Sequence, residues 1–121
     1  MRMWLVNPTT MCRNHLLGEH LELHMLASCL RNGKNISGYI EKGLVDPSIL
    51  VKRHKELVEE MKRRGYSHSS PISGLPKLLT KGHINTNANL IELVSRCHKC
   101  KENKGLVDSI ERNKKSGSDW I

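Results

Sequence analysis

Aromatic residues are scarce in this chain of 121 residues. There is no phenylalanine, and the aromatic side chains are those of Trp4, Tyr39, Tyr66 and Trp120. Proteins that bind single-stranded nucleic acid stack successive bases on several aromatic rings. Four scattered rings are too few for such a platform, so the composition argues against that class of protein.

Long apolar runs are also missing. No stretch approaches the ~20 apolar residues of a membrane-spanning helix, and no signal-peptide run precedes Asn7-Pro8. The chain has four cysteines, Cys12, Cys29, Cys97 and Cys100. They do not make a convincing disulfide framework, which favours reduced thiols. We therefore expect an intracellular protein, cytoplasmic, nucleoid-associated or encoded by a virus, that does not contact a membrane.

Acidic residues are outnumbered by basic ones. The chain contains 20 Lys and Arg against 12 Asp and Glu, which gives a formal charge of +8 and a pI near 9.6. A small basic domain commonly binds a polyanion, and nucleic acid is the leading candidate. Because the chain has so few rings, binding to duplex phosphates suits it better than binding to unstacked bases.

Three segments carry apolar residues at helical spacing. The first is predicted to run from Pro8 to about Arg31, and the second from Asp46-Pro47 to Gly65, since Asp is a good N-cap and Pro suits the first helical turn. A third helix is predicted from Asn85 or Thr86, with Leu90, Ile91, Val94 and Cys97 on one face. A weaker helix is predicted over Leu106 to Arg112.

The fold predicted from these segments is all-α. A single compact domain of three or four helices, residues 1–113, is long enough for a modest core. The short apolar segment Met3 to Val6 is expected to be extended and packed on the first helix. Residues 114–121 are expected to form a mobile tail.

The first helix carries an unusual polar face. At 100° per residue, Glu19 lies at about +40° and Glu22 at about −20° from His15. Two carboxylates and an imidazole therefore point where a helix normally buries leucine, and burying an unpaired carboxylate is costly. The face is either a buried ion pair with a core histidine, or an active site against which the amino terminus folds back.

These residues carry a family resemblance. The matching motifs are His15-Leu16-Leu17-Gly18-Glu19 with Glu22-Leu23 just behind Arg2, then Asn32-Gly33-Lys34, His54-Lys55-Glu56-Leu57 and Lys62-Arg63-Arg64-Gly65-Tyr66. Over roughly its first 66 residues the chain resembles the pyrimidine-dimer DNA glycosylase/AP lyase family of the phage endonuclease V type. The motif on the first helix stands at the same distance from residue 1 as in that family, which makes the resemblance more specific than the motif alone.

The resemblance implies a covalent mechanism. The nucleophile would be the amino-terminal α-amine, here that of Met1, which we expect to be retained before Arg2. An α-amine has a reference pKa near ~7.7–8.0, so a useful fraction is unprotonated at neutral pH. It would form a Schiff base at C1′ of a damaged nucleotide, and Glu22 would serve as the acid/base before β-elimination.

The remaining site residues are assigned supporting roles by the same resemblance. Arg2 and His15 would hold phosphate or sugar, and Glu19 would orient His15 or pair with an arginine. Backbone contacts to DNA are expected from Arg13, Asn14, His20, Arg53 and the cluster Lys62-Arg63-Arg64. The expected partner is double-stranded DNA with a damaged or modified base, bound by a monomer without metal or cofactor.

Two features depart from the phage prototype. Leu21 and Met25 stand where the prototype has arginines near the catalytic glutamate. The prototype also ends in an aromatic-rich segment, whereas this chain has only Trp120. A lesion other than the pyrimidine dimer therefore stays open as the substrate.

The motif Cys97-His98-Lys99-Cys100 is half of a zinc site. We interpret it as two reduced cysteines at the end of the third helix. The alternative is structural zinc completed through folding by Cys12 and Cys29 with His83 or His98.

Two other functions compete with the glycosylase. One is a non-catalytic basic module that binds nucleic acid by charge. The other is a metal-dependent nuclease that uses Glu19, Glu22 and His15. Activity that persists in a chelator would separate the glycosylase from the nuclease.

Overall fold

The structure, a computed structural model, describes residues 1–68 and 71–106. Its helices are α1 (Arg13–Arg31), α2 (Ser37–Glu41), α3 (Leu50–Arg63) and α4 (Thr86–Arg96), with 3₁₀ turns η1 (Pro8–Thr10) and η2 (Pro47–Ile49). Residues 98–106 are also helical. The described residues contain no strand, so the all-α prediction is confirmed.

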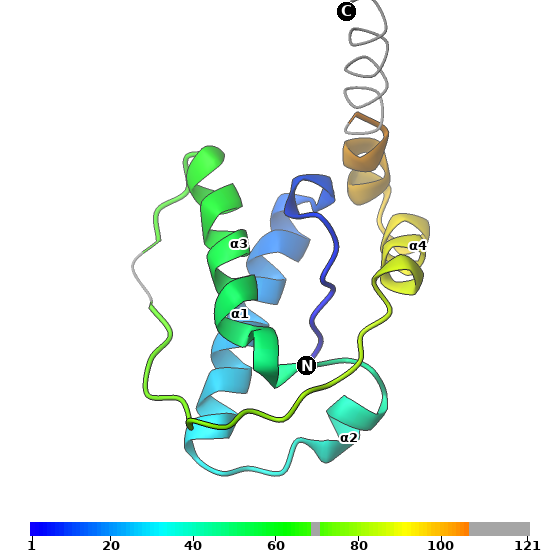
Figure 1. The fold of residues 1–121 in the computed structure, drawn as a ribbon. Helices are drawn as coiled ribbons and strands as arrows, with labels where there is room; N and C mark the ends of the chain where they lie inside the picture. The colour runs from blue at the N-terminus through cyan, green and yellow to red at the C-terminus, as the bar shows by residue number, and fades with distance from the viewer. Residues whose placement is uncertain (69–70, 107–121) are drawn as a thin grey trace, which may run out of the picture.

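The centre of the fold is the pair α1 and α3, which pack against each other (Figure 1). The extended amino-terminal segment runs between this pair and α4. The core contains fully buried side chains from all of these elements: Met3, Leu16, Leu23, Leu26, Leu50, Leu57 and Leu93. The amino-terminal segment therefore packs on α1, as predicted, and also faces α4.

Helix α1 begins later than predicted. Pro8 starts the 3₁₀ turn η1, whose Asn7 side chain accepts a hydrogen bond from the Thr9 amide. Cys12 then takes an extended conformation, with ψ 167°, and precedes the first residue of α1, Arg13. The predicted end at Arg31 is confirmed, with Gly33 in the left-handed region at φ 65°.

The other helix boundaries agree closely with the predictions. Asp46 caps η2 by accepting from the Ser48 amide, and α3 follows directly. Asn85 caps α4 by accepting from the Ala88 amide at 2.9 Å. The predicted apolar face of α4 is wrong in one respect, because Ile91 is 68% exposed while Leu93 is buried.

Glu60 lies among the charged residues of α3 but is not solvated. Glu60 is buried and accepts hydrogen bonds from the guanidinium groups of Arg63 and Arg64. Burial alone would raise the pKa of Glu60, but these two arginines more than offset it and hold the pKa below its ordinary value. Arg64 also donates to the carbonyl of Met11 at 2.7 Å, which ties the end of α3 to the segment before α1.

Residues 98–106 are helical, so a helix lies before most of the predicted segment Leu106 to Arg112. Residues 107–112 of that prediction, the predicted tail at 114–121 and Trp120 lie outside the described residues. Among the helices of the described part, none is long and apolar enough to cross a membrane.

Candidate active site

The amino-terminal segment is fixed by backbone hydrogen bonds on several sides. The Met3 amide donates to the carbonyl of Leu44 at 2.7 Å. The Trp4 amide donates to the Glu19 carboxylate at 3.1 Å, and the Trp4 carbonyl accepts from the Asn89 side chain at 2.9 Å. A short segment without a sheet partner thereby has its buried polar groups paired, as burial requires.

A buried ion pair connects this segment to both central helices. Arg53 of α3 donates to Glu19 of α1 through Nε at 2.5 Å and Nη2 at 3.0 Å. Its Nη1 donates to the Val6 carbonyl at 2.9 Å. Between these anchors Leu5 has a φ of 54°. This backbone conformation is strained for a residue other than glycine and costs of order 1–3 kcal/mol. The ion pair thus holds the bend that directs residues 1–4 toward Glu22.

Glu22 lies next to the start of the chain. Its Oε2 accepts a hydrogen bond from the Arg2 amide at 3.1 Å. Burial raises the pKa of Glu22, while the Arg2 hydrogen bond and the positive charge of the amino-terminal amine act in the opposite direction. On balance the pKa of Glu22 is raised, because burial outweighs these two effects.

A groove with a volume of about 280 Å³ opens over Arg2 and Glu22. Met1, the predicted nucleophile, is not among the residues that line it. Its lining residues are Arg2, Trp4, Asn14, His15, Gly18, Glu19, Glu22 and Arg96. The structure thus brings together most of the site predicted from the sequence, including the His15, Glu19 and Glu22 face of α1. The groove is small and polar, which suits a sugar–phosphate unit better than a large apolar ligand.

Arg2 has more partners than the sequence suggested. Its guanidinium lies 3.8 Å above the Trp4 ring and donates to the Asn89 side chain at 2.8 Å. It also forms an ion pair with Glu92. Arg2 therefore anchors the amino terminus to α4.

Several predicted DNA contacts lie elsewhere. Arg53 is 2% exposed and bound to Glu19, so the prediction that it contacts DNA is wrong. Arg13 is exposed and lies over the Tyr66 ring, outside the groove lining.

Leu21 and Met25, the positions that depart from the phage prototype, are 61% and 50% exposed.

Sequence reasoning missed the contribution of α4. Asn89, Glu92 and Arg96 surround Arg2 and Trp4, although they are more than 80 residues away along the chain. Helical spacing predicted the helix itself, but nothing in the sequence indicated which face meets the amino terminus.

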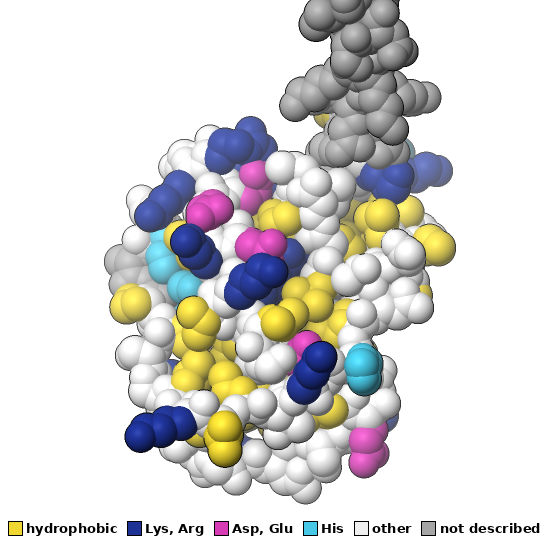
Figure 2. Space-filling model, viewed as in Figure 1, with side chains coloured by type: hydrophobic (Ala, Val, Ile, Leu, Met, Phe, Trp, Pro, Cys, Tyr) yellow, Lys and Arg dark blue, Asp and Glu magenta, His cyan; other side chains and the backbone are white. Residues whose placement is uncertain are grey.

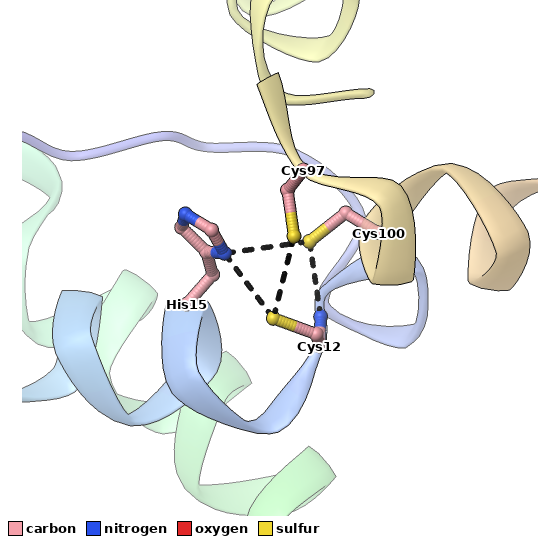
Figure 3. A group of neighbouring side chains, drawn as sticks. All are labelled: Cys12, His15, Cys97 and Cys100. Carbon is pink, nitrogen blue, oxygen red and sulfur yellow. Dashed lines mark hydrogen bonds between the residues drawn. The ribbon is translucent and has the colours of Figure 1, made fainter. Parts of the chain in front are cut away.

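Two clusters of metal-ligating side chains occur among the described residues. The first joins Cys12 and His15, at the start of α1, with Cys97 and Cys100, which follow α4 (Figure 3). His15 uses Nδ1 toward the sulfurs, while its other ring nitrogen lies on the far side of the ring. Burial, and then the charge of Arg96, lowers the pKa of His15.

The second cluster is made of four histidines, His20, His24, His54 and His68. His20, which was expected to contact DNA, packs against His24, with 4.7 Å between the ring centroids. His20 also stacks on His54 of α3 at 5.0 Å. Burial and the neighbouring imidazoles lower the pKa of His20 to about 4.

The basic residues do not form one continuous patch on the face in Figure 2. Lys and Arg side chains are scattered there, several of them beside Asp or Glu. On this face the excess positive charge is therefore spread over the surface.

Comparison with known families decides where the protein belongs. The model of the pyrimidine dimer DNA glycosylase family matches residues 1–73. The chain belongs to that family. No curated protein and no solved structure matches the chain. The family implies glycosylase activity on DNA that contains pyrimidine dimers.

The residues matched by the family model contain α1, α3 and the ion pair between Glu19 and Arg53. They also contain the amino terminus and Glu22. The match ends before α4 and before Cys97 and Cys100. The second half of the groove and half of the cysteine cluster therefore belong to a part of the chain that the family match does not cover.

Proposed function

We propose that this chain is a DNA glycosylase with AP lyase activity, with the α-amine of Met1 as nucleophile and Glu22 as acid/base. The observation that carries the proposal is the 3.1 Å hydrogen bond from the Arg2 amide to the Glu22 carboxylate. Arg2 directly follows Met1, so this bond holds the start of the chain beside Glu22. The family supports a glycosylase, and this contact supports the choice of nucleophile.

The first half of the reaction removes the base. The unprotonated amine attacks C1′ of the damaged nucleotide, and the glycosidic C1′–N bond breaks with its electron pair leaving on the base. The departing base takes up the proton that the attacking nitrogen releases. Protonated Glu22 donates its proton to the ring oxygen O4′ as the C1′–O4′ bond opens. The product is an iminium ion between the protein and the sugar, and the carboxylate of Glu22 stabilises its positive charge.

The second half breaks the strand. The iminium acidifies the C2′ proton, which the Glu22 carboxylate removes. The electron pair forms the C1′–C2′ enamine and then expels the 3′ phosphate by β-elimination. Water hydrolyses the remaining Schiff base and frees the amine for another turnover.

The other groove residues are assigned positioning roles. Glu19 and Arg53 fix the bend at Leu5, and Arg2 holds the terminus against α4. His15, Asn14 and Arg96 line the groove where the sugar and its phosphates would lie. Reaching C1′ requires the damaged nucleotide to leave the base stack, so bending of DNA or base flipping is expected.

The nuclease alternative has less support. Glu19 is engaged by Arg53, and His15 directs Nδ1 toward cysteine sulfur. Neither of the two potential metal clusters in the described part of the chain includes Glu19 or Glu22. A basic module without catalysis would not need a half-buried carboxylate beside the amino terminus.

Borohydride trapping tests the proposed function. Full-length protein is incubated with a duplex that carries one pyrimidine dimer, or one abasic site, in the presence of sodium borohydride and a chelator. Reduction of the iminium should give a stable protein–DNA adduct with both substrates. The undamaged duplex is the control and should give none.

Three outcomes would overturn the proposal. Cleavage without any trapped adduct would exclude a Schiff base. Cleavage that the chelator abolishes and magnesium, but not zinc, restores would favour the nuclease. Binding without cleavage on both damaged duplexes would leave a basic module. An adduct with the abasic duplex alone would keep the lyase and exclude the dimer as substrate.

A further inference from the structure

We propose that Cys12, His15, Cys97 and Cys100 bind a structural zinc ion. The two pairs have the spacing Cys-x-x-His and Cys-x-x-Cys, which is common in zinc sites, although 81 residues lie between His15 and Cys97. All four ligand atoms lie within 4.8 Å of one another. The zinc site considered from the sequence used Cys12 and Cys29 with His83 or His98. In the structure the histidine beside the cysteines is His15.

The distances fit a tetrahedral ion. Zn–S bonds of about 2.3 Å and Zn–N bonds of about 2.0–2.1 Å require edges of ~3.8 Å between sulfurs and ~3.6 Å between sulfur and nitrogen. The Cys12 and Cys97 sulfurs are 3.8 Å apart. His15 Nδ1 lies 3.2 Å from the Cys12 sulfur and 3.6 Å from the Cys100 sulfur.

The surroundings fit metal-bound thiolates. The Cys12 amide donates to the Cys100 sulfur at 3.1 Å. Thiolates carry negative charge that such amide donors stabilise. Cys12 and Cys100 are buried, and buried thiolates need a neighbouring cation. A bound zinc ion would supply that cation.

Zinc would also connect the cluster to the candidate active site. His15 contributes Nδ1 to the cluster and lines the groove. A metal on Nδ1 keeps the proton of the neutral ring on Nε2 and fixes the ring orientation. Cys97 follows Arg96, which lies 5.9 Å from the Trp4 ring, so the ion would hold α4 against the amino-terminal segment.

The test is metal analysis of the full-length chain purified without chelator. Blocking the thiols with a mercurial should release one zinc ion per chain, detected with a chromogenic chelator. Cobalt(II) substituted for zinc should give thiolate charge-transfer absorption in the near ultraviolet. Cys97→Ser should abolish both signals, and Cys29→Ser is the matched control that should keep them.

Because Cys97→Ser can fail to fold, the wild-type measurements decide the question alone. No zinc released by the mercurial, together with no thiolate absorption from cobalt(II), would overturn the proposal. Equal loss of both signals in Cys29→Ser would assign the metal to other thiols. Neither readout depends on glycosylase activity, so this proposal and the proposed function fail separately.

The histidine cluster carries a second and independent inference. We infer that His20, His24, His54 and His68 form a second site for a divalent transition metal. Their ligand nitrogens lie within 4.8 Å of one another, and they come from α1, α3 and the segment after α3. The buried Nε2 atoms of His20 and His68 have no hydrogen-bond partner.

Metal binding accounts for this arrangement of imidazoles. Neutral imidazole nitrogen is a good ligand for zinc, copper, nickel and iron. On α1, His20 and His24 lie about 160° around the helix from Glu22, so this site is remote from the groove. An ion here would fix residue 68 to the central helix pair. It would therefore stabilise the connection that leads from α3 toward α4.

Zinc stoichiometry tests the second site. Protein stripped with chelator, loaded with excess zinc and passed through gel filtration should retain two ions per chain. His68→Ala lies outside the helices and should retain one, still released by the mercurial. His83→Ala, an exposed histidine outside both clusters, should retain two. Equal zinc in His68→Ala and wild type, or a wild type whose zinc is all released by the mercurial, would overturn this inference.

Discussion

Glu22→Gln is expected to lower strand cleavage by about 10²–10⁴-fold, the usual contribution of a positioned acid/base group. Glutamine can still accept the Arg2 amide hydrogen bond, so the amino terminus should stay in place. It can neither protonate O4′ nor remove the C2′ proton. The measurement is single-turnover cleavage of a duplex with a dimer, alongside the affinity for the same duplex.

The matched control for this variant is Glu41→Gln, since Glu41 is exposed at the end of α2. It changes the net charge equally and should cleave like the wild type. The affinity of Glu22→Gln for the duplex should remain close to that of the wild type. Cleavage by Glu22→Gln within a factor of about three of the wild type would contradict the assigned role, because even modest acid/base catalysis is larger.

Arg53→Ala is expected to cost about 3–5 kcal/mol of unfolding free energy, the usual effect of removing one partner from a buried ion pair. The variant leaves the Glu19 carboxylate buried without its cation and the Val6 carbonyl without its donor. It also removes the support of the bend at Leu5. Urea unfolding followed by circular dichroism measures the change.

Lys52→Ala is the control for Arg53→Ala, because Lys52 is the exposed neighbour on the same helix. Its effect should stay within about 0.5 kcal/mol. The double variant Glu19→Leu with Arg53→Met should regain part of the lost stability, since it no longer buries a carboxylate without its cation. The Val6 carbonyl and the Trp4 amide stay unpaired in it. It should still lose activity, because the Trp4 amide no longer has an acceptor. A loss below about 1 kcal/mol in Arg53→Ala would show that the pair is not an important anchor.

The sequence predicted the parts of the site that depend on helical periodicity. His15, Glu19 and Glu22 share one face of any helix that includes them, so their convergence followed from spacing alone. The burial cost of two carboxylates then required partners, and the amino terminus was the nearest candidate. The caps at Asp46 and Asn85 were predictable because local chemistry determines them.

Tertiary partners could not be predicted in this way. Nothing in the local sequence distinguishes Arg53 from a solvated arginine on α3. It becomes the partner of Glu19 only because α3 packs on α1. The same limit applies to Asn89 on α4. His68 joins His20 and His24 only because the chain turns back after α3. His15 was predicted to bind phosphate or sugar. Its contact with the Cys12 sulfur, and the approach of Cys97 and Cys100, depend on tertiary packing that the sequence does not reveal.

Mapping the trapped adduct tests the central claim most directly. Wild-type protein reduced onto an abasic duplex is digested, and mass spectrometry identifies the modified nitrogen. The account predicts modification of the α-nitrogen of Met1, and loss of trapping when one residue is added before Met1. Modification of a lysine side chain, or undiminished trapping in the extended chain, would contradict it.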